Sequence, residues 1–360
     1  TIVELLNRLK INLNSSLDNI AGIYYKNKAN KREIILNPIR PLIKNLDNES
    51  SLPAYDLLPM EIYLSNPVVG IGKDIDFITS RGCPYNCTFC YQPWGHKPRF
   101  RSIDFVINAI KHLKEKYNID FISFQDDEFM ANTKRVQEFC EKINYYFPDL
   151  FWSCTGRANI VARNEDLIKI MKNAGCVSIS FGFESGSQRM LNSMNKKQTV
   201  KMMEKVIKIC RKYDLPVPVS FIIGMPGEDD ESCKETVDFC IRNNIPLYSL
   251  MFATPYPGTQ IFNFALETKR IDKNRLHEYF MKIGDARDFT VNLTEYFTDE
   301  ELIKKRKEMM KVTEGNYKNF ITKEEVKDKM KNLFGSLMDK VHLDETELDH
   351  RLKHGGMGIF

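Results

Sequence analysis

Three cysteines within eight residues constrain this chain more than any other feature. Cys83, Cys87 and Cys90 stand in the stretch Arg-Gly-Cys-Pro-Tyr-Asn-Cys-Thr-Phe-Cys-Tyr, residues 81–91. Three thiolates at this spacing can bind one face of a compact iron–sulfur cube, because the glycine, proline and asparagine let a short loop curl around it. The fourth iron then has no protein ligand. It can bind a small chelating molecule through amino and carboxylate groups and pass it an electron.

Two other uses of the thiols compete with this interpretation. Structural zinc usually takes four ligands from two separated pairs, and no second Cys-x2-Cys pair follows the motif. A disulfide framework requires an oxidising compartment, and three thiols leave one unpaired sulfur. An iron–sulfur site is therefore favoured over a structural metal site.

Composition gives no indication of a membrane or nucleic-acid partner. The 52 basic and 48 acidic side chains leave a net charge of only +4. No run of about 20 apolar residues occurs, and residues 1–10 lack the apolar segment of a signal peptide, so a reducing cytoplasm is expected. The cysteines outside the motif are then predicted to be small buried apolar residues. These are Cys140, Cys154, Cys176, Cys210, Cys233 and Cys240.

The first 75 residues show no convincing domain of their own. A short amphipathic helix is predicted from Ile2 to Leu9, and a hairpin from residues 20–25 and 33–36. Prolines from Pro38 to Pro67 are then spaced so that no long helix can form. Residues 1–75 are therefore interpreted as a connector.

From Asp76 strands and amphipathic helices alternate, with helix caps expected at Ser102 and Thr199. Six βα units of about 30 residues indicate a parallel sheet, either a curved partial barrel or an open doubly wound sheet. Chemistry in barrels lies at the carboxyl ends of strands, where the cysteine loop would lie, so a partial (β/α)6 barrel over residues 76–270 fits better. The predicted strands are residues 76–80, 119–125, 151–156, 177–183, 217–223 and 246–252.

Beyond this core, residues 271–360 are predicted to form a helical C-terminal extension. Residues 298–345 are rich in Lys and Glu, and because their charges are mixed in sign they indicate a solvated helix surface and argue against a nucleic-acid site. The tail from His354 is expected to fray.

Polar residues follow several of the predicted strands. Arg157 could clamp a carboxylate, although an exposed ion pair is the alternative. Glu184 continues the register of small residues on the fourth strand, so it should point inward and needs a partner such as Arg157 or a ribose hydroxyl. The other candidates are Gln125, Asp126 and Asp127 after the second strand, which could accept from an ammonium group or cap a helix, and Ser220 on the fifth strand.

The cysteine spacing, with an aromatic residue before the last thiol, resembles the radical S-adenosylmethionine (SAM) superfamily over residues 76–270. The resemblance implies that the three motif cysteines hold a [4Fe–4S] cluster, whose electron cleaves SAM to a 5′-deoxyadenosyl radical. It also implies a flavodoxin- or ferredoxin-like electron donor and a small-molecule or peptide substrate.

A Gly-Gly-Glu-type segment after the second strand is replaced here by Gln-Asp-Asp, and some relatives have an acidic residue in place of the arginine after the third strand. In this resemblance Phe89 and Tyr91 lie against the adenine, the Asp126–Asp127 segment takes the amino group, and Arg157, Glu184 and Ser220 occupy the carboxylate and ribose positions.

Within the superfamily the chain is most similar to the cobalamin-binding branch. The similarity lies in Asp-Asp-x-Phe after the second strand, Gly-Phe-Glu-Ser-Gly-Ser at the fourth and Thr-Pro-Tyr-Pro-Gly-Thr after the sixth. The connector resembles the segment that follows a Rossmann-like cobalamin domain in that branch. No Asp-x-His-x-x-Gly cobalamin loop is present and the sequence begins with Thr1. We therefore expect a fragment whose cobalamin domain belongs to the parent protein.

Three functions are consistent with these features. The first is a methyltransferase that uses the adenosyl radical, with cobalamin, on an unactivated carbon or phosphorus centre. The second is a radical oxidoreductase or cyclase acting on a ring system. The third is a non-catalytic iron–sulfur scaffold or electron-transfer protein, against which the three-thiol count argues, because an electron carrier normally ligates all four irons. The catalytic residues and the substrate cannot be assigned from the sequence.

Overall fold

Contacts within the chain divide the computed structural model into two units, residues 1–50 and 51–360. The structure describes residues 1–12, 15–27, 30, 33–49, 52–65 and 72–317. The predicted extension beyond residue 317, with its tail, lies outside these residues.

The first unit contains the predicted helix and hairpin. Helix α1 (Ile2–Ile11) is followed by strands β1 (Tyr24–Lys26) and β2 (Ile34–Leu36), which pair antiparallel, and by the short helix α2 (Leu46–Glu49). Asn37 fixes the preceding turn, because its side-chain amide donates to the carbonyl oxygen of Leu17 at 2.7 Å and to that of Ile20 at 3.1 Å. The predicted helix and hairpin are both present, although the first hairpin strand begins at Tyr24 and not at Ile20.

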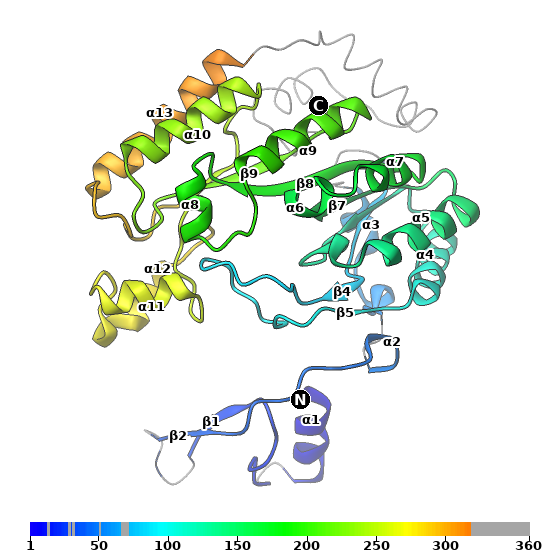
Figure 1. The fold of residues 1–360 in the computed structure, drawn as a ribbon. Helices are drawn as coiled ribbons and strands as arrows, with labels where there is room; N and C mark the ends of the chain where they lie inside the picture. The colour runs from blue at the N-terminus through cyan, green and yellow to red at the C-terminus, as the bar shows by residue number, and fades with distance from the viewer. Residues whose placement is uncertain (13–14, 28–29, 31–32, 50–51, 66–71, 318–360) are drawn as a thin grey trace. The chain divides into compact units, whose positions relative to one another are not determined.

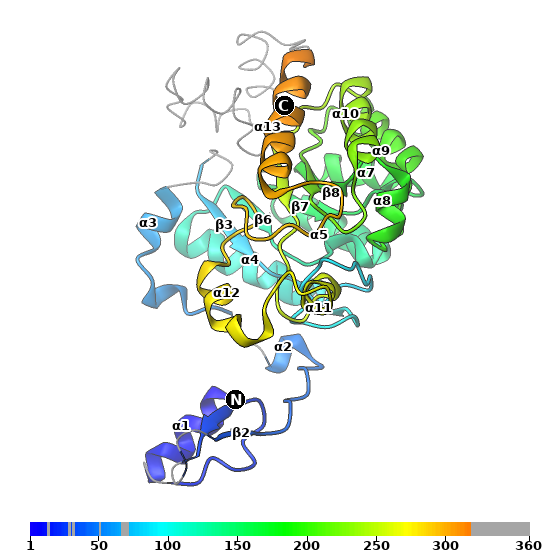
Figure 2. The same ribbon diagram turned by 90° about the vertical axis from the view of Figure 1, so that its left-hand side faces the viewer.

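The second unit is built on a six-stranded parallel sheet in the order β10-β9-β8-β7-β6-β3 (Figures 1 and 2). The strands follow one another in chain order, so the sheet has no point at which the order reverses. A doubly wound sheet requires such a reversal, whereas right-handed crossovers in one direction place all helices on one face of a curling sheet. The partial (β/α)6 barrel is therefore confirmed. Its strands are β3 (Asp74–Phe77), β6 (Phe121–Phe124), β7 (Phe151–Gly156), β8 (Cys176–Glu184), β9 (Val219–Ile223) and β10 (Leu250–Phe252).

Helices follow the strands and form one outer layer, in which α4 lies beside α5, α5 beside α7 and α7 beside α9 (Figure 1). The predicted caps are present, since Ser102 Oγ accepts from the amide of Phe105 and Thr199 Oγ1 from that of Met202. The helices of the core are α4 (Ile103–Tyr117), α5 (Thr133–Tyr146), α6 (Ala158–Val161), α7 (Glu165–Asn173), α8 (Gln188–Ser193), α9 (Val200–Lys212) and α10 (Asp230–Arg242).

The remaining elements are shorter or lie after the sheet. Helix α13 begins with a capping box between Thr298 and Glu301 and carries the mixed charges that the sequence predicts. No helix in the described ranges is both long and apolar enough to cross a membrane. The remaining elements of the second unit are η1 (Tyr55–Leu57), α3 (Met60–Ser65), β4 (Ser80–Arg81), β5 (Arg99–Phe100), η2 (Phe129–Ala131), α11 (Gln260–Glu267), η3 (Lys273–Arg275), α12 (Leu276–Lys282) and α13 (Asp299–Asn316).

Several strand limits differ from the predicted ones for identifiable reasons. The first strand begins at Asp74, a buried carboxylate that accepts from Ser123 Oγ at 3.1 Å and that a search for apolar runs passes over. Its predicted end at Ser80 belongs instead to β4, which pairs with β5. Strand β9 begins only after Pro218, because proline has no N–H for the ladder.

Aromatic side chains fill the core between the sheet and α5. Phe124, Phe129, Phe139 and Trp152 are each at most 1% exposed, and their ring centroids lie 4.9 to 5.8 Å apart. The Trp152 indole N–H donates to the carbonyl oxygen of Ala174 at 2.7 Å, so the buried ring leaves no polar atom unsatisfied. The six cysteines outside the motif are buried too, as predicted.

Truncating this cluster should destabilise the second unit strongly. We expect Phe139→Ala to lower the free energy of unfolding by about 3 to 5 kcal/mol, since it removes a buried ring and leaves a cavity. Tyr145→Ala is the matched control on α5, because this side chain is 78% exposed. It should change the free energy of unfolding by about 0.5 kcal/mol or less. Urea unfolding of both variants measures the difference, and equal losses would contradict the assigned core.

Candidate active site

The cysteine loop leaves β4 at the carboxyl end of the first core strand and returns to β5. Cys87 is buried, Cys83 is half-buried and Cys90 is exposed. Thr88 ties the middle of the loop to two distant segments, because its amide donates to the carbonyl oxygen of Met194 at 3.0 Å and its carbonyl oxygen accepts from the amide of Ile261 at 3.2 Å. The loop is therefore fastened both to the segment after β8 and to the start of α11.

The base of the loop requires glycine at position 82. Gly82 has φ +94°, a left-handed conformation, and an added Cβ would lie 2.9 Å from the carbonyl oxygen of Gly95 and 3.0 Å from that of Lys97. Its amide donates to Asp127 Oδ2 at 2.7 Å. Asp127 thus holds the start of the loop.

Burial raises the pKa of two of the three motif thiols, those of Cys83 and Cys90. The pKa of Cys83 is raised to about 11, although a backbone hydrogen bond partly offsets the effect of burial. Thiols bind metals as thiolates, so metal binding here would release protons. Two buried cations lie close by, Arg157 and Lys196, which are 7% and 6% exposed.

The polar segment after β6 supports the loop. Asp126 Oδ1 accepts from the amide of Thr79 at 2.6 Å, while Oδ2 accepts from the hydroxyls of Thr79 and Ser80 at 2.6 and 2.7 Å. Gln125 donates to Asp76 Oδ1 at 2.8 Å. Both carboxylate oxygens of Asp126 are thus occupied by the protein. Contact between this segment and a ligand amino group stays a prediction.

Glu184, at the end of β8, is 6% exposed and forms an ion pair with Lys196, with 2.6 Å between Oε1 and Nζ. Its partner is therefore Lys196, whereas the sequence suggested Arg157 or a ribose hydroxyl. The register between β8 and β9 shifts at this point, and Glu184 has φ +66°, unusual for a residue with a side chain. This shift was not apparent in the regular alternation of the strand. Lys196 Nζ also lies 5.7 Å from the centroid of the Phe89 ring.

The other predicted ligand residues occupy different surroundings. Phe89 is half-buried and packs against a methionine-rich cluster that includes Met190 and Met225, whereas Tyr91 is 59% exposed. Ser220 lies opposite Gly182 in the ladder between β8 and β9. Arg157 lies against Cys87, with 3.5 Å between Nη1 and Sγ. Their roles toward SAM stay predictions.

Two buried glutamates escaped the sequence-based selection. Glu128 is 2% exposed, and its Oε1 accepts from the amide of Met130 at 3.1 Å. Burial raises its pKa to about 7, against the opposing charge of Arg157. In the sequence it is the last of four consecutive polar residues, and nothing there distinguishes a buried acid from an exposed helix cap.

The second is Glu228, which closes the turn after β9 and is 1% exposed. Its Oε2 accepts from the amides of Gly224 and Met225, and burial outweighs these hydrogen bonds and raises its pKa to about 7. Gly224 and Gly227 both have positive φ, a conformation that glycine adopts readily in a tight turn. Glu295 accepts from the amide of Gly227 at 3.0 Å.

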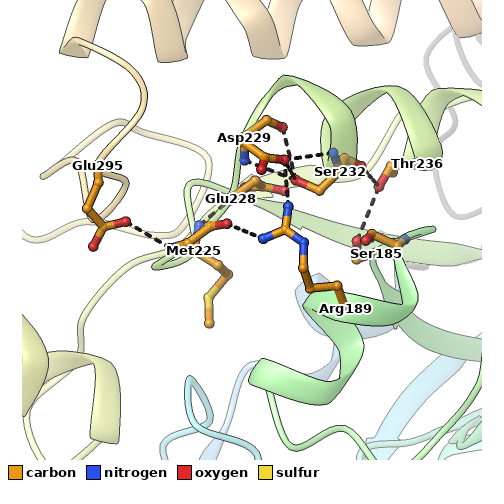
Figure 3. A network of polar contacts seen from close by, with 10 residues as sticks. Ser185, Arg189, Met225, Glu228, Asp229, Ser232, Thr236 and Glu295 are labelled. Carbon is orange, nitrogen blue, oxygen red and sulfur yellow. Dashed lines mark hydrogen bonds and ion pairs between the residues drawn. The ribbon is translucent and has the colours of Figure 1, made fainter.

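A polar network joins this turn to the end of β8 (Figure 3). Arg189 on α8 donates to the carbonyl oxygen of Gly227 and to Asp229 Oδ1, both at 2.6 Å. The hydroxyls of Ser185 and Thr236 lie 3.2 Å apart and connect the segment after β8 to α10. The turns after β8 and β9 are therefore held as one body beside the loop.

A single-ion site is not formed around the thiols. Among the described residues, no group of three or more His, Cys, Asp or Glu side chains is arranged to hold a metal ion. A His-x3-His pair, His350 and His354, does follow the motif in the sequence, outside those residues.

The fold and the loop define an α/β half-barrel protein with three thiols at the carboxyl edge of its sheet. Residues 77–240 match the family model of the radical SAM superfamily. The chain belongs to this superfamily, as its cysteine motif predicted.

Curated relatives share the core but are longer. The chain is 37% identical over 253 residues to an uncharacterized methyltransferase of Pyrococcus horikoshii, covering 69% of this chain and 53% of the relative. It is 30% identical over 233 residues to the anaerobic magnesium-protoporphyrin IX monomethyl ester cyclase of Cereibacter sphaeroides, covering 64% and 37%. The chain thus spans about half or less of the length of these relatives.

Among solved structures, the radical SAM methyltransferase TsrM from Kitasatospora setae, with cobalamin and a [4Fe–4S] cluster bound, is similar with a TM-score of 0.57. The two share 17% identity, and the match covers 75% of this chain and 53% of TsrM. At this identity the likeness concerns the fold.

Replacing Glu228 should change how stability depends on pH. Because its pKa is raised from 4.5 to about 7, the folded chain binds this proton more tightly than the unfolded chain. The corresponding stability is fully present below pH 4.5 and is lost as the pH rises through 7. Glu228→Gln keeps an acceptor oxygen but does not titrate. We expect the decline in unfolding free energy between pH 5 and pH 8 to be smaller by roughly 2 to 3 kcal/mol in the variant.

The matched control is Glu235→Gln, the same change at an exposed position of α10. Urea unfolding at several pH values measures both variants. A Glu228→Gln profile parallel to that of the wild type would show that this carboxyl group does not titrate in the range.

The buried pair Glu184–Lys196 should behave as a coupled unit. Lys196→Met leaves a buried carboxylate unpaired and should cost about 3 to 5 kcal/mol, much of which a second change, Glu184→Gln, should restore. A double-mutant cycle on unfolding free energies measures the coupling. The exposed pair Lys234–Asp238, 3.0 Å apart on α10, is the control and should show about 1 kcal/mol or less. Additive effects at the buried pair would contradict the contact.

Proposed function

We propose that this chain is the SAM-cleaving core of a radical SAM enzyme, and that the enzyme is a cobalamin-dependent methyltransferase. The observation that carries the proposal is the loop itself. It presents Cys83, Cys87 and Cys90 at the carboxyl edge of a parallel half-barrel, beside the buried cations Arg157 and Lys196. Chemistry in parallel barrels is placed at this edge.

The donor set fits an iron–sulfur cluster. Soft thiolates select iron–sulfur clusters and zinc over hard cations, and nearby positive charge favours the thiolate form. The Thr88 hydroxyl, between the second and third cysteines, is buried without a hydrogen-bond partner in the described part of the chain, so the loop retains an unused polar atom beside the thiols. A [4Fe–4S] cluster held by the three cysteines supplies a low-potential electron and an open iron position for SAM.

The residues around the loop are proposed to hold SAM. Phe89 and Tyr91 provide ring faces for the adenine, and Glu184 and Ser220 provide polar groups for the ribose. The segment Gln125–Asp127 supports the loop and thereby fixes where the amino group of SAM would lie. The methionine-rich cluster behind Phe89 excludes water from that side of the site.

Methyl transfer is favoured over ring cyclisation as the overall reaction. The relative with the higher identity is named a methyltransferase, and the similar TsrM structure is a methyltransferase that contains cobalamin. The second candidate, an oxidoreductase or cyclase, is supported by the 30% identical cyclase. Either enzyme requires a reducing electron donor, for which a flavodoxin- or ferredoxin-like protein is proposed, and a small-molecule or peptide substrate.

Metal analysis and labelled SAM test the proposal. After anaerobic reconstitution with iron and sulfide, the wild-type chain should contain about four irons, and SAM should change the EPR spectrum of the reduced cluster. Cys83→Ala, Cys87→Ala and Cys90→Ala should each lose both properties, because a three-thiol site has no spare ligand. Cys240→Ala, which changes a buried cysteine on α10, should keep them. Tetrahedral zinc without iron absorbance, or a spectrum indifferent to SAM, would contradict the proposal.

The fate of a labelled SAM methyl group separates the two reactions. With the chain joined to a cobalamin-binding domain and cobalamin added, label in methylcobalamin or in product supports the methyltransferase. Label found only in methionine, together with 5′-deoxyadenosine, supports the oxidoreductase or cyclase.

A further inference from the structure

The guanidinium group of Arg157 is buried against the cysteine loop and is engaged on every nitrogen. Nε donates to Asn159 Oδ1 at 3.3 Å, Nη1 to Cys87 Sγ at 3.5 Å, and Nη2 to the carbonyl oxygen of Lys196. One face of the group stacks on the Tyr85 ring, with 3.7 Å from Cζ to the ring centroid. A guanidinium that clamps a ligand carboxylate needs two parallel N–H groups on one edge. Here three of the five N–H groups already donate to the protein, one from each nitrogen, which fixes the plane of the group and leaves a single N–H on each terminal nitrogen.

The neighbours of Arg157 fix it in this position. Asn159 donates from Nδ2 to the Tyr85 hydroxyl at 2.8 Å, so Tyr85, Asn159 and Arg157 form a closed set of contacts. Tyr85 lies between the first two motif cysteines, and its carbonyl oxygen accepts from Gln92 Nε2 at 2.8 Å. Arg157 therefore contacts the loop through a ring and through a sulfur atom at the same time.

We propose that Arg157 is a positioning residue that holds the cysteine loop and donates a charge-assisted hydrogen bond to the Cys87 thiolate, and so raises the reduction potential of the cluster held there. This inference rests on the proposed function and assigns Arg157 a role other than the SAM carboxylate clamp that the family resemblance implied. Reduction adds one negative charge to the cluster. A fixed cation and an N–H donor at a ligand sulfur stabilise that added charge, and such hydrogen bonds and net charge set cluster potentials.

The experiment compares three variants of the full chain after anaerobic reconstitution. Arg157→Gln removes both the charge and the planar set of guanidinium N–H donors, whereas Arg157→Lys keeps the charge. The control is Arg163→Gln, which replaces arginine by glutamine at an exposed position six residues later. Iron and sulfide content shows whether the cluster assembles, and an EPR-monitored redox titration with dithionite gives its midpoint potential. Equilibrium binding of SAM to each oxidised cluster is measured in parallel.

We expect Arg157→Gln to shift the potential in the negative direction by the equivalent of at least a tenfold change in the one-electron equilibrium, about 59 mV. Arg157→Lys should shift it less, Arg163→Gln should match the wild type, and SAM affinity should change by less than about threefold. If Arg157→Gln folds by circular dichroism but takes up no iron, the loop-holding part of the proposal is supported. Arg157→Lys then measures how much the guanidinium N–H donors contribute to the midpoint potential of the cluster.

A wild-type potential in a fully loaded Arg157→Gln variant would overturn the inference. In that case, a large loss of SAM affinity would instead assign Arg157 to the SAM carboxylate. Failure of the wild-type chain itself to bind iron would count against the proposed function, so the two failures are distinguishable.

Discussion

The hydrogen bonds that Asp126 accepts from Thr79 and Ser80 connect the carboxyl ends of the first two core strands, and the position of the cysteine loop depends on this connection. Asp126 follows β6, whereas Thr79 and Ser80 lie between β3 and the loop. Asp127 continues the contact by accepting from the Gly82 amide. Because a carboxylate with several donors is costly to disrupt in a buried setting, the loop inherits the rigidity of the sheet.

The buried charged side chains at the carboxyl edge of the sheet each lie beside an oppositely charged or polar group. Lys196 is paired with Glu184, Arg157 is engaged with a sulfur, an amide and a carbonyl oxygen, and Glu128 lies near enough for the Arg157 charge to oppose the burial that raises its pKa. A buried charge without a partner would be expensive, so these residues constrain one another. The arrangement leaves two cations beside three thiols, which suits a site where negative charge accumulates.

The parallel half-barrel, the cysteine loop and the helix caps could be predicted from the sequence, because they follow from local patterns. These patterns are apolar periodicity, cysteine spacing, and Ser or Thr before a helix. Ser102 and Thr199 illustrate this success. Side-chain partners were harder to predict, because they depend on segments that meet only in the fold. Lys196 lies twelve positions after Glu184, with helix α8 between them, and a register shift between Gly182 and Glu184 accompanies the unusual conformation of Glu184. Glu128 and Glu228 were missed because the sequence of a polar turn does not reveal that its carboxylate is buried.

The unbroken strand order leaves the sheet with two edge strands. An eight-stranded barrel encloses its site on all sides, whereas here β3 and β10 are the two ends of a six-stranded sheet and do not meet. The outer side of β10 is bordered by the segment around Ala286, whose carbonyl oxygen accepts from the Phe252 amide at 2.7 Å. Without this contact the Phe252 amide would be an unpaired donor at the sheet edge, where a further strand could add. The segment around Ala286 therefore shields part of this edge from pairing with another chain.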